Sequence, residues 1–183
     1  MKLSEATAAA ALDFALRVID QTHEYAAAFK PNAAFFEAFG PECIMVLQEV
    51  IKAIPSDIPV ILDVKRGDIS STASAYADSA FDVYGADCVT LSPYMGWDSI
   101  KPFVKDKFAA KGAFVLCKTS NPSSRDFQDL ILLRAPGMKL FHAVAAQVAL
   151  WNNDKNIGNN CLGLVAGKPL SLTNNVLPLS LSY

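Results

Sequence analysis

The sequence predicts an α/β fold built on a parallel sheet, and three of its patterns support that prediction. Short apolar runs alternate with longer segments whose apolar residues recur at helical spacing, as in repeated β-α units. The short runs are continuously apolar, which is typical of strands covered on both faces. Polar residues follow these runs, where parallel strands would bring them to one edge. We therefore expect an incomplete (β/α)8 TIM barrel in which about five of the eight strands are recognisable.

The chain opens on a segment that predicts an amphipathic helix. Its apolar residues recur at helical spacing: Leu12, Ala15, Leu16 and Ile19. The alanine-rich start could pass for the core of a signal peptide, but charged residues interrupt it and no small-residue cleavage site follows. No apolar stretch reaches the roughly 20 residues that span a membrane. We expect a soluble, cytoplasmic protein with no membrane partner.

The remaining elements alternate between strands and helices. The expected strands are Tyr25–Lys30, Val60–Lys65, Cys88–Leu91, Ala113–Lys118 and Cys161–Ala166. The expected helices are Phe35–Ile54, Ser71–Tyr84, Trp97–Ala110 and Leu140–Trp151. The phosphate-loop patterns GxGxxG and GxxxxGKS/T do not occur, which disfavours a doubly wound nucleotide-binding sheet. Residues 1–183 are expected to form one partial barrel domain with a divergent tail at residues 168–183.

The composition narrows the possible partners. Hydrophobic residues make up 52% of the chain and charged residues 19%, as in an ordinary globular domain. The formal net charge of -2 gives no indication that the protein binds nucleic acid, which basic proteins attract. The four cysteines form no CxxC pair, and His23 and His142 stand alone. We therefore expect neither a disulfide nor a metal site.

Asp63, Lys65 and Asp68 stand together at the end of the expected strand Val60–Lys65. Asp63 and Lys65 are two residues apart, so in a strand their side chains project from the same face. A carboxylate and an ammonium there keep each other ionised and form a fixed charge pattern that needs no reorganisation of water. Taken alone, the three residues fit either a surface ion pair or a catalytic charge network.

The longer string around these charges resembles the orotidine 5'-phosphate decarboxylase family. PVILDVKRGDISST at Pro59–Thr72 is similar to the family's Asp-x-Lys-x-x-Asp-Ile hallmark followed by threonine. FKPNAAFFE at Phe29–Glu37 resembles its lysine-bearing second strand. Tyr94–Gly96, Thr119–Pro122 and Asp126–Gln128 match the next two loops of its bacterial subgroup, to which the decarboxylases of some protists are related. The resemblance covers about residues 12–167.

The resemblance implies a role for each charged residue of the motif. Lys65 would stabilise the carbanion left at C6 of the pyrimidine and then protonate it. Asp63 would lie beside the substrate carboxylate and orient Lys65 and Lys30. Lys30 would complete the charge network and touch the ribose. No cofactor is implied, because preorganised charge does the work.

The resemblance also implies residues that contact the substrate and a partner subunit. The expected substrate contacts are Asn32, Ile69, Thr72, Ser120, Asn121 and Pro122. Ser120 and Asn121 would read the edge of the pyrimidine ring, although a plain turn also explains them. Asp68 and Thr72 would reach into the partner's site of a homodimer, so each site would need two chains.

Three parts of the family's barrel have no counterpart in the chain. These are the first strand with its ribose-binding aspartate, the glycine-containing seventh-strand loop, and the eighth strand with its phosphate-binding arginine. Because binding of a remote phosphate commonly supports catalysis, we expect the 183-residue chain to show little decarboxylase activity. The chain is then either an orotidine 5'-phosphate decarboxylase or an impaired form of one, for example a fragment of a fused UMP synthase that acts only as a dimer partner.

Two other enzyme classes fit parts of the pattern. Sugar-phosphate epimerases and hexulose-phosphate synthases share a similar Asp-x-Lys strand, but the motifs at Lys30–Asn32 and Ser120–Pro122 argue against them. A Schiff-base aldolase using Lys65 is weaker still, because Asp63 and Asp68 would keep that lysine charged.

Overall fold

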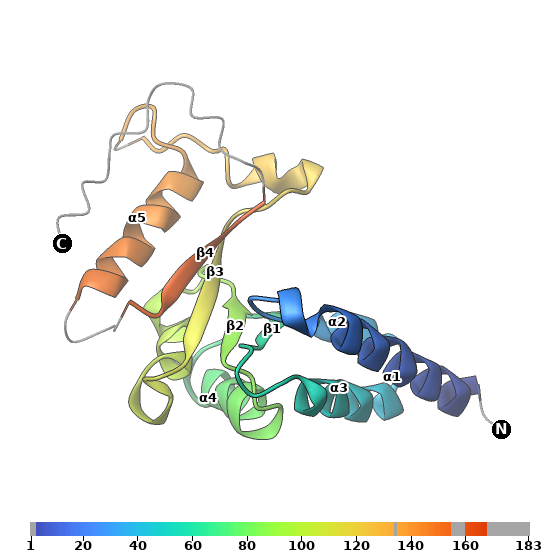
Figure 1. Cartoon of the computed structure of the whole chain (residues 1–183). Coiled ribbons are helices and arrows are strands. Elements are labelled where there is room, and N and C mark those ends of the chain that lie inside the picture. Colours follow the sequence, from blue (N-terminus) through green and yellow to red (C-terminus); the bar gives the residue numbers. More distant parts are fainter. Residues whose placement is uncertain (1–2, 134, 155–159, 168–183) are drawn as a thin grey trace.

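The computed structural model describes residues 3–133, 135–154 and 160–167 (Figure 1). Within these residues four parallel strands form one sheet, in the same order as in the chain. They are β1 (Ile61–Arg66), β2 (Cys88–Leu91), β3 (Gly112–Lys118) and β4 (Leu162–Ala166). Parallel neighbours in chain order, linked by segments with helices, are the arrangement of a (β/α) barrel. The described part is therefore a partial barrel, as the sequence predicts.

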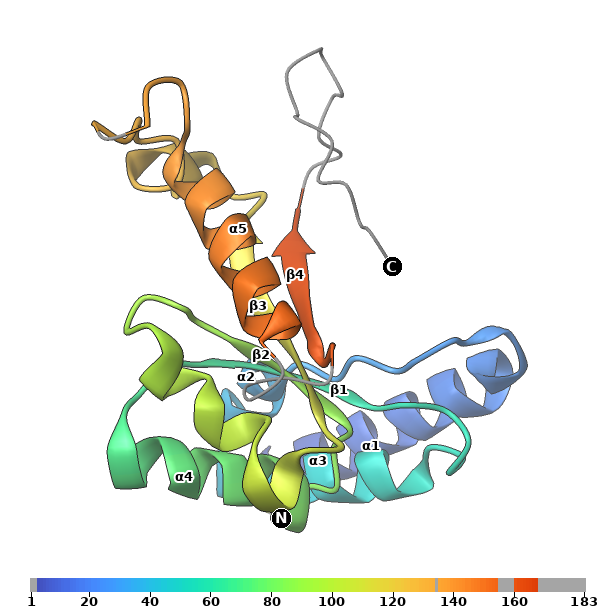
Figure 2. The same ribbon diagram turned by 90° about the vertical axis from the view of Figure 1, so that its left-hand side faces the viewer.

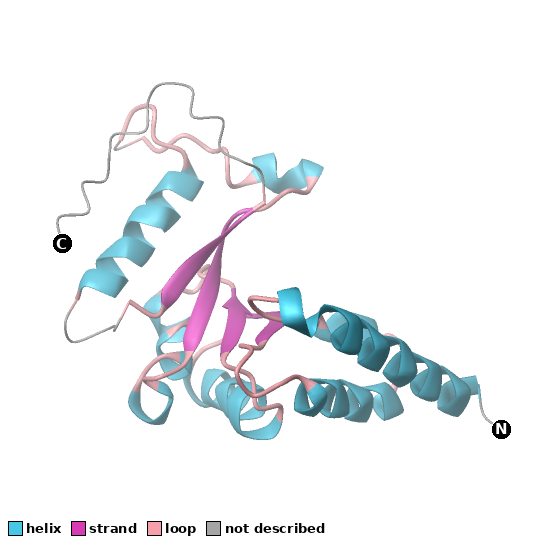
Figure 3. Cartoon of the chain, in the orientation of Figure 1, coloured by secondary structure: helices cyan, strands magenta, loops and turns pink. Residues whose placement is uncertain are grey.

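Helices flank the sheet at two places (Figures 1 and 3). The elements α1 (Leu3–Thr22), α2 (Ala33–Glu37) and α3 (Pro41–Ala53) lie together near β1, with α1 alongside α3. The helix α5 (Leu140–Asn153) packs along β3 and β4, as Figure 2 shows from the side. The helix α4 (Ser70–Asp78) follows β1 and continues into a π-helical turn at Ser79–Val83. The predicted helices at the N-terminus and at Leu140–Trp151 are thus confirmed.

The expected strand Tyr25–Lys30 is wrong as a regular strand. Tyr25 ends a 3-10 turn, and the chain after it forms only isolated parallel bridges, from Phe29 to Val60 just before β1 and from Asn32 to Asp63 in β1. Phe29 N–H donates to the Pro59 carbonyl at 3.0 Å, and Asp63 N–H donates to the Pro31 carbonyl at 2.9 Å. Pro31 has no N–H, so the ladder cannot continue through it. The segment still lies beside β1, where the prediction placed it.

Two expected helices also differ from the prediction. The segment Phe35–Ile54 is two helices, because Gly40 has a φ of 100° and Pro41 begins the second one. The segment Trp97–Ala110 contains three 3-10 turns instead of an α-helix. Pro102 lacks the N–H that an α-helix needs, and Asp106 has a φ of 54°. Apolar spacing alone did not reveal these interruptions.

The core lies between the sheet and the helices that cover it. Its fully buried side chains include Leu47, Leu62, Val89, Leu91, Ile100, Phe103 and Val115. All of β2 after Cys88 is buried, whereas β3 alternates between buried and half-buried residues. The strand β2 is therefore the central support of the sheet.

Candidate active site

The carboxylate of Asp63, near the end of β1, is the centre of a charge network. Asp63 is only 6% exposed. Lys65 donates to its Oδ1 at 2.6 Å, and Lys30 donates to its Oδ2 at 2.9 Å. Both lysine side chains are about half exposed, so their ammonium groups remain open to solvent. The predicted grouping of Lys30, Asp63 and Lys65 is present in the structure.

Asp63 stays ionised although it is buried. Burial alone would raise the pKa of its carboxyl group. Hydrogen bonds from Lys65, Lys30 and Thr90 outweigh burial and lower the pKa from 3.8 to about 2. At neutral pH the network therefore consists of one hidden negative charge between two accessible lysines.

The backbone at Lys65 departs from a regular strand. Lys65 has a φ of 46°, in the left-handed region that non-glycine residues rarely adopt. The pairing of β1 with β2 shifts in register between Leu62 and Arg66, as at a β-bulge. Asp63 and Lys65 therefore meet through a bulge, and not through the simple alternation of a strand. Such backbone strain costs on the order of 1–3 kcal/mol, and it is often found at functional sites.

Thr90 in β2 holds this bulge, and the sequence analysis missed it. Its hydroxyl donates to Asp63 Oδ1 at 2.8 Å and accepts from the N–H groups of Lys65 at 2.9 Å and Val64 at 3.1 Å. Thr90 is 4% exposed, so each of these bonds forms away from bulk water. A hydroxyl inside the otherwise apolar run Cys88–Leu91 was the signal that could have identified it.

Asn32 and Asp68 stabilise local turns on either side of the network. The Asn32 side chain accepts from Ala34 N–H at 3.1 Å and so caps α2. Asp68 accepts from Ile69 N–H at 2.8 Å, and in the described ranges it forms no ion pair. Ile69 and Thr72 are exposed on the same segment. The structure thus places Ile69 and Thr72 at the surface and Asp68 half-buried in the segment that follows β1, without joining them to Lys65.

Ser120, Asn121 and Pro122 follow β3, at the same edge of the sheet as the charge network. All three are exposed. Gly167 lies against this turn, since its N–H donates to the Lys118 carbonyl and a Cβ on it would come within 2.7 Å of Ser120 N. Any side chain at residue 167 would therefore displace the turn.

A second cluster of charges ties down the loop that carries this turn. Asp129 accepts from Lys118 at 3.0 Å and from Lys139 at 3.2 Å. These bonds lower the pKa of Asp129 below its ordinary value. The cluster's members are 10 and 11 residues apart, in β3 and in the loop after it, and no motif of the sequence joins them.

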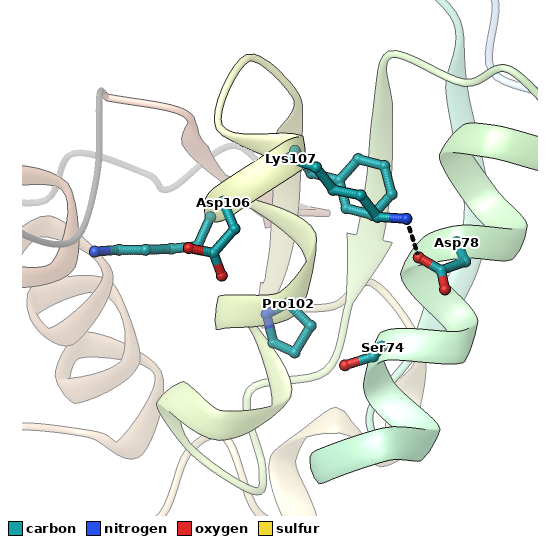
Figure 4. A pocket seen from close by; sticks show the side chains of 7 residues that line it. Ser74, Asp78, Pro102, Asp106 and Lys107 are labelled. Carbon is teal, nitrogen blue, oxygen red and sulfur yellow. Dashed lines mark ion pairs between the residues drawn. The ribbon is translucent and has the colours of Figure 1, made fainter.

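A pocket of about 410 Å³ lies elsewhere, between α4 and the 3-10 turns that follow Ile100 (Figure 4). It is lined by Ser74, Asp78, Pro102, Lys105, Asp106, Lys107 and Phe108. Lys107 pairs with Asp78 at 2.7 Å at its rim. None of its residues is a predicted site residue, so the pocket and the charge network are separate features.

The described residues contain neither a metal cluster nor a membrane-spanning helix. No group of three or more His, Cys, Asp or Glu side chains there could hold a metal ion. No described helix is long and apolar enough to cross a membrane.

The fold and the network together define an α/β barrel protein with a lysine–aspartate–lysine site at the carboxyl edge of its parallel strands. The model of the orotidine 5'-phosphate decarboxylase / HUMPS family matches residues 7–176. The chain belongs to this family.

Relatives support the same assignment. The chain is 49% identical over 152 residues to an orotidine 5'-phosphate decarboxylase of Herpetosiphon aurantiacus, covering 82% of this chain and 55% of that protein. It is 52% identical, with a TM-score of 0.79, to the structure of Leishmania donovani OMP decarboxylase, covering 87% of this chain and 60% of that one. The structure of Leishmania donovani UMP synthase matches with the same identity, TM-score and coverage of this chain, and 34% of that chain is covered. The chain thus spans about half the length of the curated relatives it matches.

Proposed function

We propose that the chain carries the catalytic site of an orotidine 5'-phosphate decarboxylase, which converts orotidine 5'-phosphate to UMP and CO2 in pyrimidine biosynthesis. The observation that carries the proposal is the network of Lys30, Asp63 and Lys65. It presents two accessible ammonium groups around a carboxylate that stays charged. Fixed charges of this kind stabilise a developing anion without a cofactor.

The proposed reaction assigns to each charge the role that the family resemblance implies. The bond between C6 and the carboxylate breaks, CO2 leaves, and the electron pair remains on C6. The Lys65 ammonium stabilises this carbanion and transfers a proton to it, which gives UMP. Asp63 lies beside the departing carboxylate and orients both lysines. Lys30 contacts the ribose, and the residues proposed to contact the rest of the nucleotide are Asn32, Ile69, Thr72, Ser120, Asn121 and Pro122.

The family name also covers hexulose-phosphate synthases, so two activities have to be distinguished. The names of the most similar relatives help to distinguish them. The curated relatives that are 44–49% identical are orotidine 5'-phosphate decarboxylases by name. A second lysine on the catalytic carboxylate suits two anionic groups, the substrate carboxylate and the carbanion. These two points favour decarboxylation over chemistry on a phosphosugar.

The test is an assay of purified protein with orotidine 5'-phosphate, following the fall in substrate absorbance. We expect turnover that depends on Lys65, at a rate below that of a complete relative assayed beside it. If the protein binds neither orotidine 5'-phosphate nor UMP at millimolar concentration, the proposal is contradicted. A control with a hexulose-phosphate substrate should show no reaction.

We further propose a cytoplasmic homodimer in which Asp68 and Thr72 complete the partner's site. The exposure of Thr72, and the lack of an ion pair for the half-buried Asp68 in the part described, support this arrangement. Mixing inactive Lys65→Ala and Asp68→Ala chains should regenerate one intact site per heterodimer, and hence activity. Heterodimers that form but stay inactive would mean that Asp68 acts within its own chain.

A further inference from the structure

The turn after β3 contains a short chain of hydrogen bonds with a defined direction. The backbone N–H of Thr119 donates to Gln128 Oε1 at 2.8 Å. Gln128 Nε2 donates to the Thr119 hydroxyl at 2.8 Å, and that hydroxyl donates to Asn121 Oδ1 at 2.6 Å. Three hydrogen bonds thus link four backbone and side-chain groups in series, and the series ends at a residue proposed to contact the pyrimidine.

The backbone N–H fixes the direction of the whole series. An N–H group can only donate, so Gln128 must turn its carbonyl oxygen toward Thr119 N. Its amide nitrogen then faces the hydroxyl, which accepts that bond and has one proton left to donate. The structure directs that proton to Asn121 Oδ1, so Asn121 presents its oxygen to Thr119. Its amide nitrogen, with two donors, points away from the hydroxyl.

We infer that Gln128 and Thr119 are positioning residues that make Asn121 a hydrogen-bond donor toward the bound base, and so select a ring carbonyl over a ring amino group. The inference rests on the proposed function and refines it. Asn121 is exposed, and in the described residues its amide nitrogen has no partner within the chain. A donor at this position matches the carbonyl of a uracil-type ring. Cytosine carries an amino group there, which would leave two donors facing each other.

One substitution reverses the direction of the series. In Gln128→Glu, the carboxylate can still accept from Thr119 N–H, but it cannot donate to the hydroxyl. The hydroxyl then donates to the carboxylate, and only its lone pairs face Asn121. Asn121 would turn over, donate to the hydroxyl, and present its oxygen to the base.

The experiment compares UMP with CMP, which share ribose and phosphate, so that differences in phosphate binding cancel. NMR titration of the purified chain measures both dissociation constants even in the millimolar range. We expect the parent protein to prefer UMP by about tenfold, the effect of roughly one well-formed hydrogen bond. Gln128→Glu should abolish or invert the preference, and Thr119→Val should abolish it. Thr119→Ser keeps the hydroxyl and should retain it.

Gln48 provides a matched control, because its side chain bonds to a backbone carbonyl far from this turn. Gln48→Glu should leave the UMP preference unchanged. If Gln128→Glu and Thr119→Val both keep the parent's preference, this series of hydrogen bonds does not set specificity. The same conclusion follows if the parent binds the two nucleotides equally. If the parent binds neither nucleotide, the proposed function itself fails, which is a distinct result.

Discussion

The described residues contain two clusters in which one aspartate binds two lysines, and the two clusters bury opposite charges. In the first cluster, the Asp63 side chain is 6% exposed, and its lysines are 55% and 49% exposed. In the second, Asp129 is 31% exposed, whereas Lys118 is only 18% exposed. The first cluster therefore keeps its carboxylate away from water and offers its ammonium groups outward. The second partly hides an ammonium and uses the carboxylate to hold a loop.

The two clusters have the same charge composition, so composition alone does not distinguish a candidate active site from ion pairs that hold a loop. They differ in the elements and hydrogen bonds that position the aspartate. Asp63 belongs to a strand, and the buried Thr90 hydroxyl adds a third hydrogen bond to it. Asp129 belongs to a loop and binds its two lysines directly. Burial of the carboxylate, with exposure of its partners, is the arrangement suited to acting on a bound anion.

The largest difference between the clusters is expected in catalysis. Lys65→Ala should lower turnover by about 10²–10⁴-fold, the usual contribution of a general acid, and leave the fold intact. Lys139→Ala, the matched change in the second cluster, should change turnover only slightly. Both variants are assayed with orotidine 5'-phosphate. If Lys65→Ala keeps a tenth or more of the parent's turnover, the two clusters do not differ in catalysis as expected.

Asp63 should make stability depend on pH. Its pKa in the folded protein is about 2, below the ordinary 3.8, so the ionised form stabilises the fold. This stabilisation is complete well above pH 3.8, and it is lost as the pH falls through about 2. The parent should lose about 2 kcal/mol relative to Asp63→Asn over this range. Urea unfolding of both proteins at several pH values measures it, and parallel curves would contradict the ionised state.

Thr90 should contribute less, because it supports the network without carrying charge. Thr90→Val keeps the shape but removes the bonds to Asp63 and to the N–H groups of Val64 and Lys65. We expect a loss of about 1 kcal/mol in the free energy of unfolding. Thr90→Ser should retain most of it. Equal stability of the valine and serine variants would show that the hydroxyl does not matter.

The smallest effect is expected for Asp129. Its carboxyl group is open to solvent, which screens its pairs with Lys118 and Lys139. Asp129→Asn should therefore show a weaker dependence of stability on pH than Asp63→Asn, in the same urea experiments. A dependence as strong as that of Asp63 would mean that the two clusters are energetically alike.

The sequence was informative where local patterns determine structure. The apolar runs of β1 to β4 predicted the parallel sheet, and the motif around Asp63 and Lys65 predicted their pairing. It was less informative where proline or glycine interrupts an apolar pattern, as at Pro31, Gly40 and Pro102. These residues change the backbone without changing the periodicity of the apolar residues.

The candidate site was predicted as a set of charges, but its support was not. Thr90 lies about 25 residues from Lys65 in the chain, and only the pairing of β1 with β2 brings them together. Lys118 and Asp129 are 11 residues apart and Gln128 and Thr119 are 9 apart, and the loop after β3 brings each pair together. The sequence alone did not predict either contact, so the roles of these residues became visible only in the fold.

The strand order of the sheet also bears on how the chain folds. Each strand pairs with the one made just before it, so during synthesis every new strand finds its neighbour already present. Cys88 pairs with Gly112, whereas Ala113 pairs with Leu162, which closes about twice as much chain. Doubling a loop costs only about 0.6 kcal/mol of closure entropy. The sheet can therefore grow strand by strand from β1, and its last addition, β4, is only slightly harder to make than the one before.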